Sequence, residues 1–429
     1  MPANPLSPEL PCPAETTLSG APLSPYRWVV LTAVVINNSA FTLVALSFGL
    51  LLPAIRDTMH LSETQAGWLG ASLGMGFVAT TIPVSVLMGK MHPVRLFGFS
   101  IIVGAAATAA QGAARSFWIF LLARLVFGLT SSMRGPARPM LTQQWHPRRE
   151  ISLASGMIVG LGGIGEAMAL VVTPWILNAT GSWRTTLYLY AAFGLAVVLL
   201  WFALVRQHTT PAFSQQVRAQ ARPSIPSLFR YRQLLLLGAG AMTMTFGFTV
   251  SRTFWPTYML EAHGLPLTHS GWIMGLTAIV LIPSSVVQGY LGSRYGMRRV
   301  PLIFSGAAMV AGSVGMMLTG SLPLLVLCSI AQGLAWGFMA IAISYAYELP
   351  GIDTLEVAVA VSAVVTIFML GTIIGPVIAG AIADATGSLF IALMVSSIVP
   401  LGLCVAALRL HDLSRQPTAA AGPPIVSAP

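Results

Sequence analysis

The sequence has few charged residues and few cysteines. Only 8% of its 429 residues are charged, whereas 55% are hydrophobic. Because a soluble domain carries roughly 25% charged residues, most of the surface of this chain must face lipid rather than water. The three cysteines, Cys12, Cys328 and Cys404, have no metal-binding spacing. The last two lie in apolar segments, where cysteine acts as a small core residue.

The sequence also lacks the motifs of common catalytic and ATP-driven proteins. It contains no Gly-x4-Gly-Lys-Ser/Thr loop and no His-Glu-x-x-His pair. A dinucleotide-like pattern, Gly160-Leu-Gly162-Gly-Ile-Gly165, lies inside a long apolar segment instead of after a strand. Close packing of helices through small residues explains it better. We therefore expect a protein that is not an enzyme and that holds no cofactor and no metal.

Long apolar segments are what the sequence does contain. A helix needs about 20 mostly apolar residues to cross a bilayer. Twelve segments qualify, at residues 28–50, 66–88, 96–114, 117–139, 152–177, 184–205, 234–258, 268–290, 299–319, 322–346, 360–382 and 388–408. Backbone groups in lipid must be satisfied within helices. The sequence therefore predicts an all-α membrane protein with twelve transmembrane helices.

The basic residues predict the orientation of these helices. With the N-terminus in the cytoplasm, the inner segments hold fifteen Lys and Arg residues, and the outer loops hold only Arg56, Arg115 and Arg184. The positive-inside rule then places both termini in the cytoplasm, with the protein in the inner (plasma) membrane of a bacterium. The net charge of +10 is thus a topology signal with some attraction for anionic lipid, and it does not indicate nucleic-acid binding.

The chain divides into two similar halves. The basic segment 206–233 separates a bundle at 27–205 from a second at 234–410, and the ends, 1–26 and 411–429, are predicted to be disordered. Ala-Thr-Gly-Ser occurs at 179–182 and again at 385–388, and Pro-then-Gly-Trp occurs at 53–68 and again at 256–272. Two parallel six-helix bundles of this kind rock about a shared midplane site in transporters.

The segment after the eighth apolar stretch carries a family resemblance. It reads Gly289-Tyr-Leu-Gly-Ser293-Arg294-Tyr-Gly296-Met-Arg298-Arg299. This resembles the cytoplasmic signature of the major facilitator superfamily, except that the family usually has an aspartate where Ser293 stands. The resemblance covers residues 27–410 and implies the fold and solute transport as a monomer. Among subfamilies, the chain is similar to bacterial permeases of the nitrate or cyanate type.

In that family, the acid and the arginine of this loop form a salt-bridge gate. The equivalent loop of the first half, Gly89-Lys-Met-His-Pro93-Val-Arg95, has a proline at the acidic position. The charge-pair gate is therefore in doubt, and the arginines either dock on helix C-termini or only anchor the topology. The resemblance implies a cytoplasmic gate made of Gly89, Arg95, Gly289, Ser293, Arg294, Gly296 and Arg298.

Ionisable residues inside apolar segments are functional candidates because they are costly to insert. Glu166 is the only acid well inside a segment, about 21 Å from the cytoplasmic side, and Arg124 lies about 10 Å from the outer side. In a core roughly 30 Å thick, the two reach a similar depth. We predict that they form either a switchable proton site or a permanent structural pair.

Other polar residues inside the segments are open to two interpretations. Arg134 and Arg138 snorkel to the interface or face the interior, and Arg252 snorkels outward or contacts an anion. Amides and hydroxyls near the midplane bind a polar solute or bond neighbouring helices. The predicted solute-binding set is Asn37, Asn38, Arg124, Thr245, Arg252 and Gln332.

The favoured function is proton-linked uptake of a small organic or inorganic anion, with Glu166 as the coupling residue. The alternative is proton-coupled efflux of a drug-like or amphipathic metabolite. Exporters of the family often have Gly-Pro in the fifth segment, whereas this chain has Gly165-Glu166, which leans against export. The expected partners are a small-molecule solute, protons and the lipid bilayer.

Overall fold

The computed structural model describes residues 24–88, 93–206, 232–295, 298–339, 341–342 and 354–410. This part of the chain is almost entirely helical and contains no strand. The first half comprises α1 (Arg27–Met59), α2 (Glu63–Met88), α3 (Pro93–Ala113), α4 (Phe117–Trp145), α5 (Arg148–Thr180) and α6 (Trp183–Leu204). The second comprises α8 (Arg232–His263), α9 (Leu267–Tyr295), α10 (Arg299–Leu318), α11 (Leu322–Ala335), α13 (Thr354–Thr386), α14 (Leu389–Ile398) and α15 (Leu401–Arg409). Nearly all of the predicted N-terminal tail, the whole C-terminal tail and nearly all of the linker at 206–233 lie outside the described residues.

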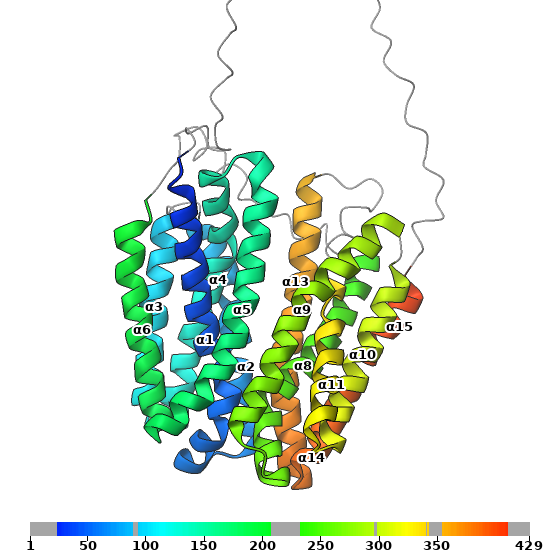
Figure 1. Ribbon diagram of the computed structural model, residues 1–429. Coiled ribbons are helices and arrows are strands. Elements are labelled where there is room, and N and C mark those ends of the chain that lie inside the picture. Colours follow the sequence, from blue (N-terminus) through cyan, green and yellow to red (C-terminus); the bar gives the residue numbers. More distant parts are fainter. Residues whose placement is uncertain are drawn as a thin grey trace, which may run out of the picture.

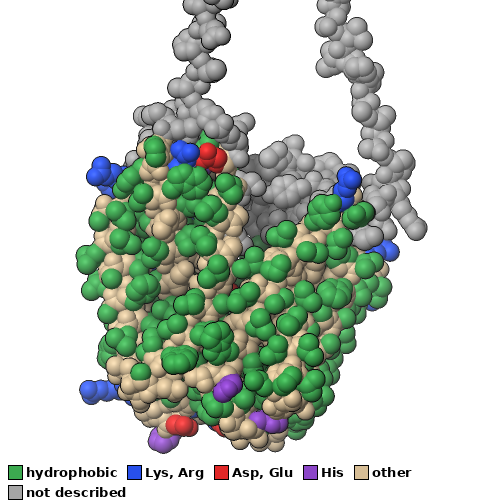
Figure 2. All heavy atoms as spheres, viewed as in Figure 1, with side chains coloured by type: hydrophobic (Ala, Val, Ile, Leu, Met, Phe, Trp, Pro, Cys, Tyr) green, Lys and Arg blue, Asp and Glu red, His purple; other side chains and the backbone are tan. Residues whose placement is uncertain are grey.

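The helices stand side by side and present an apolar surface. Ten helices of the described part are long and apolar enough to cross a membrane. Helix α2 and the shorter apolar α11 occupy the second and tenth predicted spans. Hydrophobic side chains cover the flank of the molecule, and charged ones gather near its two ends (Figure 2). The predicted all-α membrane fold is therefore confirmed.

Two predicted spans are broken rather than continuous. The tenth ends as α11 at Ala335, because a turn at Trp336-Gly337 interrupts the helix. The carbonyl of Leu334 there accepts hydrogen bonds from Gln288 Nε2 (2.8 Å) and Ser284 Oγ (2.6 Å) of α9. The twelfth span breaks between α14 and α15 at Pro400, whose ring lacks the N–H that a continuous helix needs.

The Ala-Thr-Gly-Ser repeat has the same structural role in both halves. Gly181 and Gly387 adopt left-handed backbone angles, with φ of 63° and 67°, which residues with a side chain rarely adopt. They end α5 and α13. The next residues, Ser182 and Ser388, cap α6 and α14 by accepting hydrogen bonds from the main-chain N–H groups of Thr185 and Ile391. The same sequence thus makes the same helix–helix corner twice.

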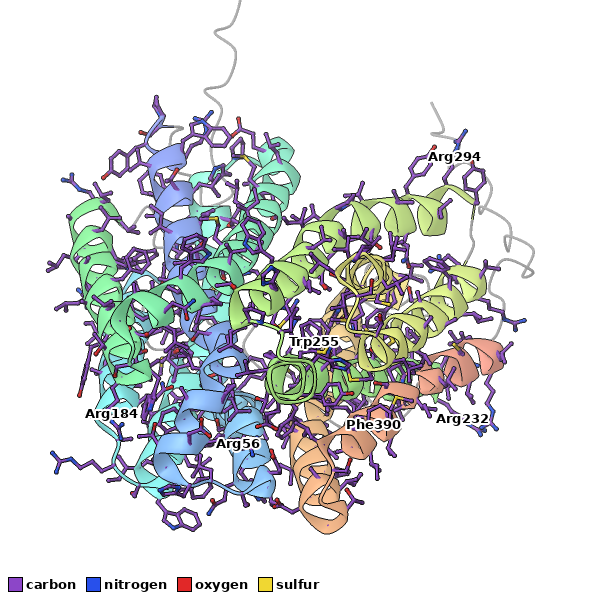
Figure 3. The ribbon with its side chains drawn as sticks, turned by 60° about the horizontal axis from the view of Figure 1, so that its bottom comes forward. Arg56, Arg184, Arg232, Trp255, Arg294 and Phe390 are labelled. Atoms are coloured by element: carbon purple, nitrogen blue, oxygen red, sulfur yellow. The ribbon has the colours of Figure 1, made fainter. Side chains whose placement is uncertain are left out.

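The two halves meet at one end of the molecule (Figure 1). We call the end where α1 begins the N-side and the end where α1 finishes the far side; Figure 3 turns the far side toward the reader. The closest approaches between the halves pair small residues with backbone. A Cβ on Gly67 would lie 2.2 Å from the carbonyl oxygen of Pro376, and one on Gly271 would lie 2.4 Å from that of Leu170. The far side is therefore closed in this structure, and the ribbons of the halves diverge toward the N-side.

Candidate functional site

A layer of partly buried charge lies where α1 crosses α8. A Cβ on Gly49 of α1 would lie only 1.9 Å from the carbonyl oxygen of Arg252 on α8, so the two helices touch through their backbones. The Arg252 guanidinium forms an ion pair with Glu166 of α5, with Nη2 3.3 Å from Oε1. It also lies over the ring of Phe248, 4.7 Å from the centroid. Since α5 and α8 belong to different halves, this ion pair joins the halves.

The predicted pair of Arg124 with Glu166 is wrong in this structure. Arg124 is buried, and its Nε donates to the carbonyl of Leu69 (2.9 Å) and to Ser72 Oγ (3.2 Å). Its guanidinium lies 4.0 Å from the centroid of the Phe48 ring. No carboxylate of the described residues is within ion-pair distance of it. Arg124 contacts α1 and α2, whereas Glu166 contacts α8.

Arg134 and Arg138 do not snorkel to the interface as one interpretation expected. Arg134 is only 5% exposed, and Arg138 donates from Nη2 to Asn38 Oδ1 at 2.7 Å. The neighbouring Asn37 is wholly buried, and its main-chain carbonyl accepts a hydrogen bond from Arg134. Arginine side chains from α4 thus contact both predicted asparagines of α1.

Thr245 and Gln332 bond neighbouring helices in this structure. Thr245 Oγ1 donates to the carbonyl of Phe368 on α13 (2.7 Å), and Gln332 Nε2 donates to Ser313 Oγ on α10 (3.0 Å). Both are buried, so their place in a solute site stays a prediction. Beside them, the ring of Trp336 packs against Phe248 at the break after α11, with centroids 4.6 Å apart.

The predicted cytoplasmic gate is only partly described. Gly89 and Gly296 lie outside the described residues, as does the side chain of Ser293. Arg95 and Arg294 are exposed at the N-side ends of α3 and α9; Figure 3 labels Arg294. Gly289 lies within α9, and Arg298 precedes α10. The gate therefore stays a prediction.

Comparison with known proteins identifies the family. The family model described as the Major Facilitator Superfamily matches residues 30–352 and 237–426, which together span nearly the whole chain. The chain belongs to the Major Facilitator Superfamily. It is therefore a membrane transporter and not an enzyme, and its site serves the passage of a small molecule.

Several other transporters resemble this chain at low sequence identity. The chain is 22% identical to the uncharacterized transporter YybO of Bacillus subtilis, across 91% of this chain and 95% of that protein. It is 25% identical to a probable nitrate/nitrite antiporter, NarK1, of Thermus thermophilus, across 67% of each. It is 23% identical to the hexuronate transporter of Bacillus subtilis, across 78% of this chain and 83% of that one.

Among solved superfamily structures, the nucleoside transporter NupG has a similar fold. It superposes with a TM-score of 0.74 at 16% identity, across 92% of this chain and all of that one. At such low identity the likeness concerns the fold alone. The solute and the role of each residue must be argued from the geometry of this chain.

Sequence reasoning missed a set of charged contacts that joins the halves at the far side. Arg56 of α1 pairs with Glu63 of α2 (2.8 Å) and, across the halves, with Glu261 of α8 (3.2 Å). The carboxylate of Asp384 on α13 accepts hydrogen bonds from the main-chain N–H groups of Glu63 (2.9 Å) and Thr64 (2.8 Å). An acid at a helix N-terminus is favourable because it meets free N–H groups and the positive end of the helix dipole. Asp384 gave no sequence signal, since its partner Thr64 lies 320 residues away in the chain.

We expect Asp384→Ala to shift the protein toward conformations that are open at the far side. The change removes both acceptors from the start of α2, and these bonds exist only while the far side is closed. We expect a shift of roughly two- to threefold, at the low end of capping effects, because the carboxylate is exposed to solvent. Arg115 and Ser321 are exposed at the far-side ends of the two halves. Spin labels at these two positions would report the shift as a larger population of long label-to-label distances.

Asp57→Ala is the matched control, because Asp57 is an exposed acid at the same end. Equal distance distributions for the two variants would show that the Asp384 contact does not influence the conformational equilibrium.

Proposed function

We propose that the protein is a secondary transporter that couples the uptake of a small anion to protons across a bacterial inner membrane, with both termini in the cytoplasm. The observation that carries this proposal is the ion pair of Glu166 with Arg252, which joins the two halves inside the membrane. The surroundings of a titratable acid at that position change whenever the two halves move relative to each other. The N-side is then the cytoplasmic side, and the structure is closed to the outside.

The excess of buried positive charge supports an anion as the solute. Four arginines, Arg124, Arg134, Arg138 and Arg252, lie buried or partly buried in the described interior, and of these Arg252 is paired with the acid Glu166. An isolated charge in a low-dielectric site is costly, so a bound anion is stabilised there. The names of two relatives, a hexuronate transporter and a probable nitrate/nitrite antiporter, concern anions as well.

Arg252 is the residue best placed to exchange partners during transport. Its Nη2 contacts Glu166, while its Nη1 is buried and without a hydrogen-bond partner. A solute carboxylate or oxyanion that binds Nη1 competes with Glu166 for the same guanidinium, which arginine presents as a planar fork. Protonation of Glu166 releases Arg252 for the anion, so that proton and anion bind together.

Uptake into proteoliposomes tests the anion proposal. Radiolabelled nitrate and glucuronate serve as probes under an imposed pH gradient. We expect Arg252→Ala to reduce anion uptake about 10-fold or more, because a charged hydrogen bond contributes about 1.5–3 kcal/mol. Arg252→Lys, which keeps the charge but loses the fork, should retain part of the activity.

Arg232→Ala is the control, since Arg232 is an exposed arginine on the same helix (Figure 3). If both alanine variants transport every tested anion as well as the unmodified protein, Arg252 does not bind the solute.

A further inference from the structure

The ring of Phe248 on α8 contacts both an arginine and a tryptophan. The Arg252 guanidinium lies over this ring, 4.7 Å from the centroid. The indole of Trp336 meets the same ring edge to face, with centroids 4.6 Å apart and the planes at 75°. Beyond Trp336, the ring of Phe368 continues the aromatic surface at 6.1 Å. The guanidinium that carries the proposed anion contact therefore stands beside an aromatic surface, and Trp336 lies one aromatic ring away from it.

The indole N–H of Trp336 is a second donor at this place. Its nitrogen is buried and has no acceptor among the described residues. Three other buried indoles each donate a hydrogen bond at 3.0–3.1 Å, namely those of Trp183, Trp201 and Trp255. A buried indole N–H usually finds an acceptor, because leaving the bond unmade is costly. Arg252 Nη1 is unpartnered in the same way, so two donors that contact one ring are both free to bind a solute.

These side chains border the space between the halves. Arg252 and Glu166 keep 11% and 24% of their side-chain surface exposed. An ion pair that joins the halves is exposed to the space between them rather than to lipid, where charge is costly. Trp336 lies in the turn that ends α11, and it and Phe248 are partly exposed. Broken helices at membrane depth commonly form the solute sites of transporters, which places Trp336 at such a site.

With Arg252 as the anion contact of the proposed function, we infer that the solute is a carboxylate carried on a six-membered ring, with an oxygen acceptor on the opposite side of that ring. The carboxylate binds Arg252, the ring lies against Phe248, and the distal oxygen accepts a hydrogen bond from Trp336 Nε1. A solute of this length reaches both donors, whereas nitrate is too small to do so. An aromatic ring stacks against Phe248, and the C–H face of a sugar ring packs against it as an apolar surface.

Trp336→Phe tests this assignment because it keeps an aromatic ring and removes the indole N–H. Trp272→Phe is the matched control, since Trp272 is an exposed tryptophan on α9 of the same half. The Tm of each purified full-length protein is titrated with 4-hydroxybenzoate, benzoate, glucuronate and nitrate. The rise in Tm with concentration gives a Kd for each compound. Benzoate is the reference, because it has the carboxylate and the ring but lacks the distal oxygen.

We expect Trp336→Phe to weaken the binding of the compound with the distal oxygen about 3- to 10-fold, which is the effect of one neutral hydrogen bond. The Kd values of benzoate and nitrate should stay unchanged in this variant, and Trp272→Phe should bind all four compounds as the unmodified protein does. A loss for 4-hydroxybenzoate indicates an aromatic solute, and a loss for glucuronate indicates a sugar acid.

Three results would overturn the inference: a Tm that neither 4-hydroxybenzoate nor glucuronate raises, equal Kd values for both compounds in Trp336→Phe and Trp272→Phe, or an equal loss for benzoate. Arg252→Ala separates these results from the proposed function. If Arg252→Ala loses binding and Trp336→Phe keeps it, Arg252 binds the anion and Trp336 does not contact the solute. If Arg252→Ala binds every compound as tightly as the unmodified protein, the anion site of the proposed function fails as well.

Discussion

Glu166→Gln should abolish proton-driven accumulation of the solute while leaving exchange down a gradient intact. Glutamine keeps the size of the side chain and its hydrogen-bonding capacity, but it cannot take up or release a proton. In the far-side-closed structure, the Arg252 guanidinium lies 3.3 Å from the carboxyl group of Glu166. When the halves separate at the far side, that arginine moves away, and an unpaired carboxylate in a low-dielectric site takes up a proton. Closure returns Arg252 and drives the proton out toward the N-side.

Proteoliposomes separate these two activities. Accumulation of labelled anion is measured under an imposed pH gradient, and exchange is measured with unlabelled anion inside and no gradient. The control is Glu150→Gln on the same helix, because Glu150 pairs with Arg27 at the N-side, away from the ion pair of Glu166 with Arg252. If Glu166→Gln still accumulates anion against its gradient, Glu166 has a structural role and coupling lies elsewhere.

Gly49→Ala should hold the protein open at the far side. The added Cβ would lie 1.9 Å from the carbonyl oxygen of Arg252, a distance that no real Cβ contact allows, and the group it meets is backbone. Closure of α1 against α8 then requires the helices to move apart. Overpacking typically costs about 1–3 kcal/mol, which corresponds to a shift of about 5- to 150-fold between two conformations. Turnover should fall by a similar factor, because each cycle requires closure.

Spin-label distances across the far side and transport rates check this prediction together. We expect longer distances and slower exchange in Gly49→Ala, with solute still able to bind from the far side. Gly156→Ala is the control, since a Cβ there would meet nothing within 4 Å. Normal exchange by Gly49→Ala would show that this crossing is looser in the membrane than its backbone contact indicates.

The site was harder to predict from the sequence than the fold. Depth arithmetic assigned Arg124 as the partner of Glu166, whereas the structure pairs Glu166 with Arg252. Depth along a helix follows from counting residues at 1.5 Å each. The direction in which a side chain points depends on how its helix is rotated against neighbours from the other half. The choice between a snorkelling and an inward-facing Arg134 stayed open for the same reason, because position near a helix end does not show which face is buried.

The sequence by itself determined the membrane class, the number of spans, the division into halves and the corner at Ala-Thr-Gly-Ser, because these depend on hydrophobicity and on local backbone preferences. Only the tertiary structure decided which charges meet. Glu166 with Arg252, Arg56 with Glu261, and Asp384 with the start of α2 each join residues from different halves. Each of these contacts exists because glycines let the two halves approach to backbone distance at the far side, and no local pattern in the chain encodes that approach.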